Sequence, residues 1–245
     1  MATDLVSAVL AAAAGEIGYR EGPNNANKYG VWYGMNYAPW CAIFVSWCFN
    51  QAGALKAIPG GKFAGCTPEW TAAIKAGRWT TSNPQPGYIV MLDFNDNRSP
   101  DHTGIVEKVL VDGIQTIEGN TGGAGGDGVY GKIRNSHILG YIIPDWAAAG
   151  GLAPAPVSAV MLTPTAAAKA RPVLKLGHKN VMHLGINIAK DAQTRLIVAG
   201  FSCGKAGIDG HIGSDTDKAI RAFQAARNLV PDGAIGQYTW TALGV

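Results

Sequence analysis

The sequence predicts an α+β protein of two domains, and three observations lead to this prediction. Helical apolar spacing recurs in the first part of the chain, whereas residues 88–144 contain short β-type runs separated by Gly, Asn and Asp turns. Helices followed by a series of strands favour an antiparallel β-meander. A segment rich in Ala, Pro and Gly at 147–170 is expected to be a linker between residues 1–146 and residues 171–245, which carry a repeated motif.

The first expected helix covers residues 3–15, where Leu5, Val9 and Ala12 recur at helical spacing. This stretch is apolar enough to imitate a signal peptide, but it lacks a basic leading region and carries Asp4 where Lys or Arg would stand. We therefore expect an ordinary helix and no signal peptide. No stretch approaches the roughly 20 apolar residues of a membrane-spanning helix.

Two cysteines lie in the apolar run APWCAIFVSWC at 38–48, inside a helix expected over 39–52 and ended by Gly53. On a helix, Cys41 and Cys48 share a face but lie about 10 Å apart along the axis. A disulfide needs Cα atoms within roughly 7 Å, and no Cys-x-x-Cys or His-x-x-x-His spacing indicates zinc. The run therefore holds either a nucleophile or two core thiols.

Position along the helix distinguishes the two cysteines. Pro39 suits a first helical residue, which places Cys41 in the first turn. Free N–H groups and the positive end of the helix dipole favour a thiolate there, whereas Cys48 lies near the opposite end. Cys41 is therefore the candidate nucleophile, although from this run alone a buried core thiol is the more common outcome.

The β region supplies partners for a nucleophile. We expect one more helix at 68–76 and strands at 88–94, 102–110, 114–120, 128–134 and 138–144. A thiolate nucleophile needs a base, and the base needs an orienting group. His102 opens one strand, and Glu118 and Asn120 lie two residues apart on the next, so we expect them to share a face near the His102 ring. A surface histidine beside an edge acid is the alternative that these strands alone allow.

Residues 171–245 contain an internal repeat, DGHIGSDT at 209–216 and DGAIGQYT at 232–239. We expect a helix over 189–200, a second helix after the first copy and a last turn after the second copy. The result is a small three-helix unit with two equivalent loops. In the loops we expect turn glycines, core isoleucines and turn-capping aspartates, namely Gly210, Gly213, Gly233, Gly236, Ile212, Ile235, Asp209 and Asp232.

The net charge of +3 is too small to indicate a nucleic-acid partner, but the charge is unevenly distributed. Residues 149–245 carry 10 Lys and Arg against 5 Asp and no Glu. This half favours an anionic surface modestly, and a solvated basic face explains it equally well. His178, His183 and His211 are scattered without an acidic cluster, so we expect no zinc.

Three motifs in order, PWCAIFVSWC, HTGIVEKV and IEGNT, strongly resemble the CHAP domain, the cysteine, histidine-dependent amidohydrolase/peptidase of bacterial and phage cell-wall lytic enzymes. The resemblance covers about residues 3–146 and implies a papain-like fold. It also implies Cys41 as the nucleophile, His102 as the base, Glu118 as the orienting acid and Asn120 as a further polar partner.

The sequence departs from this family at two points. Tyr88 follows the Pro-Gly that opens the first strand, where the family often has Asp. Some relatives bind calcium just upstream of the cysteine, but residues 24–38 contain no carboxylate, so we expect no calcium, other metal or cofactor. A protein made in the cytoplasm keeps its thiols reduced, which disfavours a conceivable Cys48–Cys66 disulfide.

Residues 173–244 resemble a three-helix peptidoglycan-binding domain through GIDGHIGSDTDKAIRAFQAARNLVPDGAIGQYTWTAL, with an insertion-like stretch before the first helix. Together with the missing signal peptide, the domain pair resembles a bacteriophage endolysin. This resemblance implies bacterial peptidoglycan of a Gram-positive-type wall as the partner, a monomer, and residence in the host cytoplasm until a holin permits release to the wall.

The resemblance implies hydrolysis of an amide bond of peptidoglycan, as an N-acetylmuramoyl-L-alanine amidase or, alternatively, as an endopeptidase within the stem peptide or cross-bridge. A non-catalytic wall-binding protein is the alternative of another class. Trp40, Tyr37 and Trp32 are expected to line a substrate groove, with core packing as the alternative. Tyr238 and Trp240 are expected to contact the wall.

Overall fold

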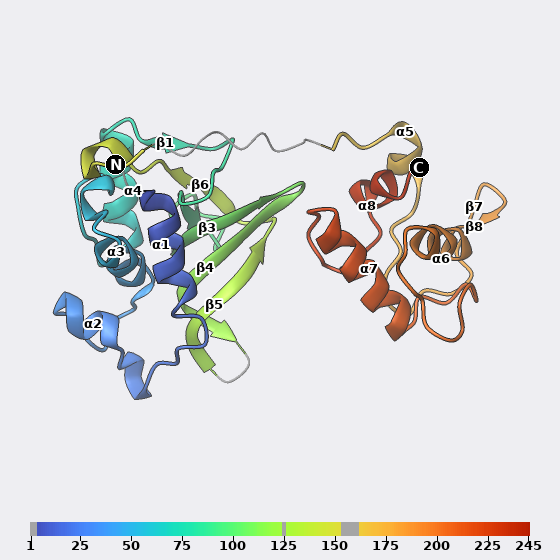
Figure 1. Ribbon diagram of the computed structural model, residues 1–245, viewed down its shortest axis with the longest axis horizontal. Helices are drawn as coiled ribbons and strands as arrows, with labels where there is room; N and C mark the ends of the chain where they lie inside the picture. Colours follow the sequence, from blue (N-terminus) through green and yellow to red (C-terminus); the bar gives the residue numbers. More distant parts are fainter. Residues whose placement is uncertain (1–3, 124–125, 153–161) are drawn as a thin grey trace. The chain divides into compact units, whose positions relative to one another are not determined.

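The computed structural model describes residues 4–123, 126–152 and 162–245. The chain forms two compact units (Figure 1). The first unit comprises Met1–Val109 and Ile114–Val157, and the second comprises Leu110–Gly113 and Ser158–Val245. Each unit has its own hydrophobic core, so each is described by itself.

The helices of the first unit agree closely with the expected ones. They are α1 Leu5–Ala14, α2 Lys28–Tyr33, α3 Cys41–Gln51 and α4 Cys66–Lys75, with short 3₁₀ turns at Pro23–Asn25, Leu55–Ala57 and Trp146–Ala149. Asp4 caps α1 because its carboxylate accepts a hydrogen bond from the Ser7 N–H at 3.1 Å. Helix α2 was not expected, since its sequence contains three aromatic residues and a glycine and has little helical periodicity.

A six-stranded sheet follows the helices in the first unit. Its strands are β1 Trp79–Thr80, β2 Ile89–Leu92, β3 His102–Leu110, β4 Gly113–Gly123, β5 Gly126–Arg134 and β6 Ile138–Ile142, in the order β1-β6-β2-β3-β4-β5. Strands β2 to β5 form the expected meander. Strand β6 instead returns beside β2, which is buried along its whole length and therefore needs a hydrogen-bonding partner on both edges.

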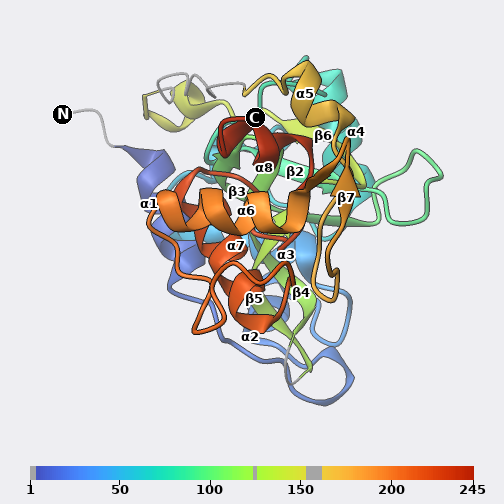
Figure 2. The same ribbon diagram turned by 90° about the vertical axis from the view of Figure 1, so that its right-hand side faces the viewer.

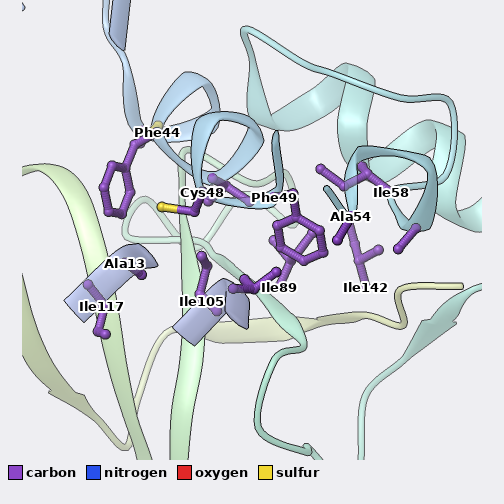
Figure 3. Close-up of a cluster of buried hydrophobic side chains, with 14 of the residues drawn as sticks. Ala13, Phe44, Cys48, Phe49, Ala54, Ile58, Ile89, Ile105, Ile117 and Ile142 are labelled. Carbon is purple, nitrogen blue, oxygen red and sulfur yellow. The ribbon is translucent and has the colours of Figure 1, made fainter. Parts of the chain in front are cut away.

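The main core of the first unit lies between the helices and one face of this sheet. Figure 3 shows side chains of α3, including Phe44, Cys48 and Phe49, above the strand residues Ile89 and Ile105. All five are inaccessible to solvent. Helix α3 is therefore held firmly against the sheet, and its first residue is held with it.

The second unit contains the three expected helices, one further short helix and two short strands. The expected helices are α6 Ile188–Val198, α7 Ser214–Ala226 and α8 Gln237–Ala242 (Figure 2), and buried side chains of all three form the core of this unit. Strands β7 Met182–His183 and β8 Ile186–Asn187 form a small hairpin beside α6. This hairpin accounts for the insertion-like stretch.

Helix α5, Ala166–Ala170, lies inside the range 147–170 that composition predicts as a linker. It forms because Thr165 caps its N-terminus and because Ala168 is buried in the core of the second unit. Residues 153–161 of the expected linker lie outside the described residues, and its first residues belong to the 3₁₀ turn Trp146–Ala149. No helix in the described ranges is long and apolar enough to cross a bilayer.

Candidate active site

Cys41 is the first residue of α3, two positions nearer the N-terminal end of the helix than expected. Pro39 lies before the helix, and Trp40 is the N-cap residue. The Cys41 side chain is 8% exposed. Because α3 begins at Cys41, the sulfur lies where free N–H groups and the helix dipole stabilise negative charge most strongly.

His102 and Glu118 come together from adjacent antiparallel strands, as expected. His102 is the first residue of β3, and its Nε2 lies 3.0 Å from Oε2 of Glu118 in β4. Both side chains are buried. A carboxylate at Nε2 keeps the ring proton on that nitrogen, so Nδ1 is the nitrogen available for proton exchange.

Two residues that were not predicted hold the Glu118 carboxylate. Arg134 donates from Nε to Oε1 at 2.8 Å and from a terminal guanidinium nitrogen to Oε2 at 2.5 Å. The Thr116 hydroxyl donates to Oε1 at 2.6 Å. Although burial opposes the charge, the hydrogen bonds from Arg134 and His102 lower the pKa of Glu118 to about 2.

The strand pattern contains a signal for these two residues. Thr116 precedes Glu118 by two positions and so lies on the same face of β4. In the β4–β5 pairing, Ile114 is opposite Arg134 and Glu118 is opposite Tyr130, so Arg134 also shares that face. The pairing register was needed to find it.

Cys41 and His102 interact as a strongly shifted pair. Hydrogen bonding by the neighbouring Cys66 thiol, followed by His102 and the Ala42 N–H, holds the pKa of Cys41 well below its usual range despite burial. Burial lowers the pKa of His102, but hydrogen bonds and charge from Cys41 and Glu118 outweigh it and raise that pKa to about 9. Around neutral pH the pair is therefore a thiolate and an imidazolium.

Asn120 does not share a face with Glu118, so the expectation of simple alternation is wrong here. The β4–β5 register shifts between Glu118 and Thr121, and Asn120 has a left-handed φ of 54°. Its carboxamide oxygen accepts a hydrogen bond from the Trp40 N–H at 2.8 Å. Asn120 thus satisfies a backbone donor at the start of α3 and fixes the position of the Cys41 end of the helix.

Two glycines within the matching motifs make room for this arrangement. A Cβ on Gly104 would lie 2.5 Å from Cγ of Glu118, and a Cβ on Gly119 would lie 2.6 Å from side-chain atoms of Phe44 and Trp40. Gly104 therefore permits the inward position of the carboxylate. Gly119 permits the close approach of α3 to β4.

A pocket of about 360 Å³ opens beside His102. It is lined by Phe94, Asn95, Asp101, His102, Asn120, Thr121 and Gly122. The Phe94 ring centre is 6.0 Å from that of His102, and Phe94 is 43% exposed. Sequence patterns did not indicate Phe94 as a site residue, because it was expected at the end of a strand over 88–94. Strand β2 ends at Leu92 instead, and Phe94 lies in the turn between β2 and β3.

The three aromatic residues expected in a groove occupy different surroundings. Trp40 is fully buried, stacks on Tyr29, and donates from its indole to a Glu21 oxygen at 2.6 Å, so it is a core residue and cannot line a groove. Tyr37 is 65% exposed with a left-handed φ of 68°. Trp32 is half-buried and packs against the core. None of the three is among the lining residues of the pocket at His102.

The second unit separates its two expected wall contacts. Trp240 is fully buried, and its indole donates to the Pro172 carbonyl at 3.2 Å, so the expectation of an exposed contact is wrong for this residue. Tyr238 is half-buried and borders a surface hollow together with Arg171 and Gln237. It therefore remains a candidate contact.

The repeated loops of the second unit are built as turns. Gly210 and Gly233 have left-handed φ values of 80° and 75°, and Ile212 and Ile235 are fully buried. The carboxylate of Asp209 accepts from the His211 N–H at 2.8 Å, and the carboxylate of Asp232 accepts from the Ala234 N–H at 2.8 Å. These contacts agree with the turn-forming and capping roles expected for the loops.

Comparison with protein families agrees with this two-part arrangement. The CHAP domain family matches residues 32–120, which contain Cys41, His102, Glu118 and Asn120. The peptidoglycan binding domain family matches residues 187–243. None of the curated proteins with which the sequence was compared matches it.

Two solved structures show limited similarity. A peptidoglycan-binding protein from Clostridioides difficile in complex with glutamine hydroxamate is 18% identical with a TM-score of 0.26, over 66% of this chain and 73% of that chain. The crystal structure of Ly7917 is 20% identical with a TM-score of 0.33, over 58% of this chain and 62% of that chain, which is less than two thirds of Ly7917. The same protein has also been solved with the hydrolyzing product of MDP, at 20% identity and a TM-score of 0.32, over 57% of this chain and 62% of that chain.

The family matches, not the structural similarities, decide the assignment. A CHAP domain beside a peptidoglycan-binding domain supports a peptidoglycan hydrolase. The chain therefore carries a CHAP domain over residues 32–120, followed by a peptidoglycan-binding domain over residues 187–243.

Proposed function

We propose that this protein cleaves an amide bond of peptidoglycan by cysteine-dependent hydrolysis, as an N-acetylmuramoyl-L-alanine amidase. The observation that carries the proposal is the arrangement of Cys41 at a helix N-terminus, His102 beside it and the Glu118 carboxylate 3.0 Å from the far side of the imidazole. A nucleophile, a base and an orienting acid in this order can perform acyl transfer.

In the first step, the Cys41 thiolate attacks the carbonyl carbon of the scissile amide. Negative charge develops on the carbonyl oxygen, and the backbone N–H of Cys41 at the start of α3 is a suitable donor to it. The His102 imidazolium then gives its Nδ1 proton to the leaving amine. The C–N bond breaks, which releases the amine and leaves a thioester on Cys41.

In the second step, neutral His102 takes a proton from a water molecule, and the resulting hydroxide attacks the thioester. Collapse of the second tetrahedral intermediate releases a carboxylic acid and restores the Cys41 thiolate. Glu118 stabilises imidazolium and fixes the ring proton on Nε2 throughout the cycle. Arg134 keeps Glu118 charged and in place, so it acts as a positioning residue.

The second unit would hold the enzyme at its polymeric substrate. A basic surface favours the anionic polymers of a bacterial wall, and Tyr238 with Arg171 and Gln237 supplies an amphipathic contact. Local concentration on an insoluble substrate raises the rate of cleavage without any change in the site itself.

The test compares Cys41→Ala with Cys48→Ala in the full chain. Both substitutions remove a buried thiol from the same helix, but only Cys41 faces His102. We expect Cys41→Ala to abolish the release of soluble fragments from purified peptidoglycan while it still pellets with the polymer. Cys48→Ala should clear the polymer, because Cys48 packs only in the core.

Mass spectrometry of the released fragments identifies the bond. An amidase liberates stem peptides with a free N-terminal L-Ala and leaves muramic acid with a free lactyl carboxylate. New amino groups within the stem peptide or cross-bridge would instead assign the protein as an endopeptidase. Clearance by Cys41→Ala would refute the cysteine mechanism, and a wild-type protein that binds without cleaving would indicate a non-catalytic wall-binding protein.

A further inference from the structure

Cys66 brings a second thiol to the candidate active site. It is the first residue of α4, as Cys41 is the first residue of α3, and the two sulfur atoms lie 3.6 Å apart. Each residue is 8% exposed. Two helix N-termini that each begin with a cysteine therefore converge on one pair of sulfurs, from segments 25 positions apart in the chain.

The proposed hydrolytic mechanism does not use Cys66. Base, orienting acid and nucleophile are complete without it, and the third cysteine of this unit lies elsewhere. Cys48 is fully buried among apolar side chains between α3 and the sheet (Figure 3). A buried pair of thiols in contact at a reactive centre thus calls for an explanation of its own.

The two thiols differ in reactivity in a way that sets their order of reaction. Cys41 carries the thiolate. The hydrogen bond from Cys66 to Cys41, burial, and the negative charge of Cys41 raise the pKa of Cys66 well above its usual range. An oxidant therefore attacks Cys41 first, and Cys66 is a protonated thiol waiting beside it.

We propose that Cys66 is a resolving thiol that converts peroxide-oxidised Cys41 into a Cys41–Cys66 disulfide and so preserves the nucleophile in a reversible, inactive form. The inference uses the proposed nucleophilic role of Cys41 for its functional consequence, but disulfide formation itself is independent of that role. The co-reactant is a small peroxide such as hydrogen peroxide, and the restoring agent is a thiol reductant.

The chemistry balances in two steps. The Cys41 thiolate attacks one oxygen of hydrogen peroxide, the O–O bond breaks, and Cys41 sulfenic acid and hydroxide form. The Cys66 sulfur then attacks the Cys41 sulfur, the S–O bond breaks, and the hydroxyl leaves with the Cys66 proton as water. Peroxide is reduced, and the two thiols together are oxidised by two electrons.

The geometry suits this closure. A disulfide bond is about 2.05 Å long, so the sulfurs must approach by roughly 1.5 Å, which is within the reach of side-chain rotation. Without a resolving thiol, continued peroxide would carry Cys41 to sulfinic acid, which thiol reductants do not reverse. Cys66 therefore decides whether oxidation of the site is reversible.

The test compares the wild-type full chain with Cys66→Ser and with Cys48→Ala as the matched control. Each protein is treated with hydrogen peroxide, divided, and incubated with or without dithiothreitol. Intact mass, tryptic peptides and peptidoglycan hydrolysis are measured, with activity expressed relative to the same protein before treatment. Trypsin separates the two thiols into peptides 29–56 and 63–75.

We expect the wild type and Cys48→Ala to lose two hydrogen atoms, to yield the 29–56/63–75 cross-linked peptide, and to regain most activity with dithiothreitol. Cys66→Ser should gain two oxygen atoms on Cys41 and regain less than about a tenth of its activity. The inference is overturned if no cross-link forms in the wild type or if Cys66→Ser recovers as fully as the wild type. If the cross-link forms but the reduced protein never cleaves peptidoglycan, the proposed function fails while the disulfide assignment stands.

Discussion

The two units use buried polar side chains in opposite ways. In the second unit, Gln193 of α6 and Gln224 of α7 each lie at the centre of one repeated loop. Gln193 donates to the Asp209 carboxylate at 2.7 Å, to the His211 carbonyl at 3.0 Å and to a threonine hydroxyl, and it accepts from the Gly210 N–H at 2.7 Å. The side chain has no unused polar atom.

Gln224 repeats this network in the second loop. It donates to the Asp232 carboxylate at 2.7 Å, to the Ala234 carbonyl at 2.9 Å and to the Thr239 hydroxyl at 3.1 Å, and it accepts from the Gly233 N–H at 2.9 Å. The motif D-G-x-I-G-x-x-T thus forms a loop whose polar groups hydrogen-bond to a glutamine side chain from the preceding helix.

The first unit, in contrast, concentrates charge and buries a carboxyl group that has no hydrogen-bond partner among the described residues. Cys41, His102 and Glu118 have displaced pKa values, and neither side-chain oxygen of the buried Glu69 has a hydrogen-bond partner within the described residues. Fully satisfied polar groups stabilise a fold, whereas displaced and costly ones mark a reactive site. The comparison teaches which polar residues to test for rate and which for stability.

Among the substitutions that test this comparison, Glu118→Gln should have the largest effect on the rate of hydrolysis. It removes the charge that supports the His102 imidazolium, so we expect kcat/KM to fall by about 10²–10⁴-fold. The rate of the wild type should decline as pH rises through about 9, where His102 loses its proton, and in the variant the decline should begin at lower pH.

A pH profile of hydrolysis measures both changes. Glu107→Gln on the neighbouring strand is the control, since among the described residues the Glu107 carboxylate bonds to Gln115 and not to the site, so the profile should stay intact. An unchanged alkaline limb in Glu118→Gln would remove Glu118 from the proposed mechanism.

Arg134→Met should have the largest effect on stability. It leaves the Glu118 charge buried without its guanidinium partner, which costs about 3–5 kcal/mol. Glu118 has a folded pKa of about 2, below its unfolded value, so its contribution is present above about pH 4.5 and is lost as pH falls toward 2. The variant should lose most of that pH dependence.

Urea unfolding followed by tryptophan fluorescence between pH 2 and 7 gives the free energies. Lys132→Met, a cation on the same strand and face, is the control and should change stability by less than about 0.5 kcal/mol. Equal stability of Arg134→Met and the wild type at pH 7 would show that Glu118 does not depend on this ion pair.

Gln193→Leu and Gln224→Leu test the satisfied networks of the second unit. Each substitution leaves a buried glycine N–H and several acceptors without partners, so we expect each to destabilise this unit by about 2–4 kcal/mol. The two losses of stability should be similar, because the two networks consist of the same kinds of hydrogen-bond partner. Thermal unfolding of the second unit measures them against Gln237→Leu, an exposed glutamine at the start of α8. A large loss of stability in one variant and none in the other would show that the two loops are not equivalent.

Glu69→Met should give the smallest change, and in the opposite direction. Burial raises the pKa of Glu69 well above its usual range, so the folded protein keeps a proton that the unfolded chain releases above about pH 4.5. That difference makes the wild type less stable as pH rises. We expect Glu69→Met to raise the unfolding free energy by about 1–2 kcal/mol at neutral pH, with a gain that grows with pH. Glu69→Gln should not give the neutral-pH gain, because it keeps a buried polar group; a destabilised Glu69→Met would indicate that the carboxyl has a structural partner.

Local pattern was sufficient for most elements and for the reactive trio. Helical spacing in 3–15 and turn residues around His102 depend on contacts within a few positions, so they can be recognised without the fold. The approach of His102, at the start of β3, to Glu118, within the adjacent strand β4, follows from the pairing of consecutive strands. The contact of Arg134 with Glu118 could not be predicted in this way, because it depends on the β4–β5 pairing register, which no local pattern contains.

The predictions that were wrong share a physical cause, because each concerned a side chain whose position depends on tertiary packing. Trp40 and Trp240 were expected at a ligand surface, but both are in the cores, where their large apolar area is removed from water and each indole finds an oxygen acceptor. Asn120 leaves the expected face because a bulge interrupts the strand. Aromatic residues near a site predict either packing or recognition, and only the packed structure distinguishes them.

The sequence by itself determined that an N-terminal α+β domain carries a candidate nucleophile at a helix start and that a repeated three-helix unit follows, because periodicity, turn residues and motif order are local properties. Only the tertiary structure decided that Arg134 holds Glu118, that Asn120 fixes the start of α3, and that Cys66 rather than Cys48 lies against Cys41. These are contacts between distant segments, and their distances depend on how α3, α4 and the sheet pack together.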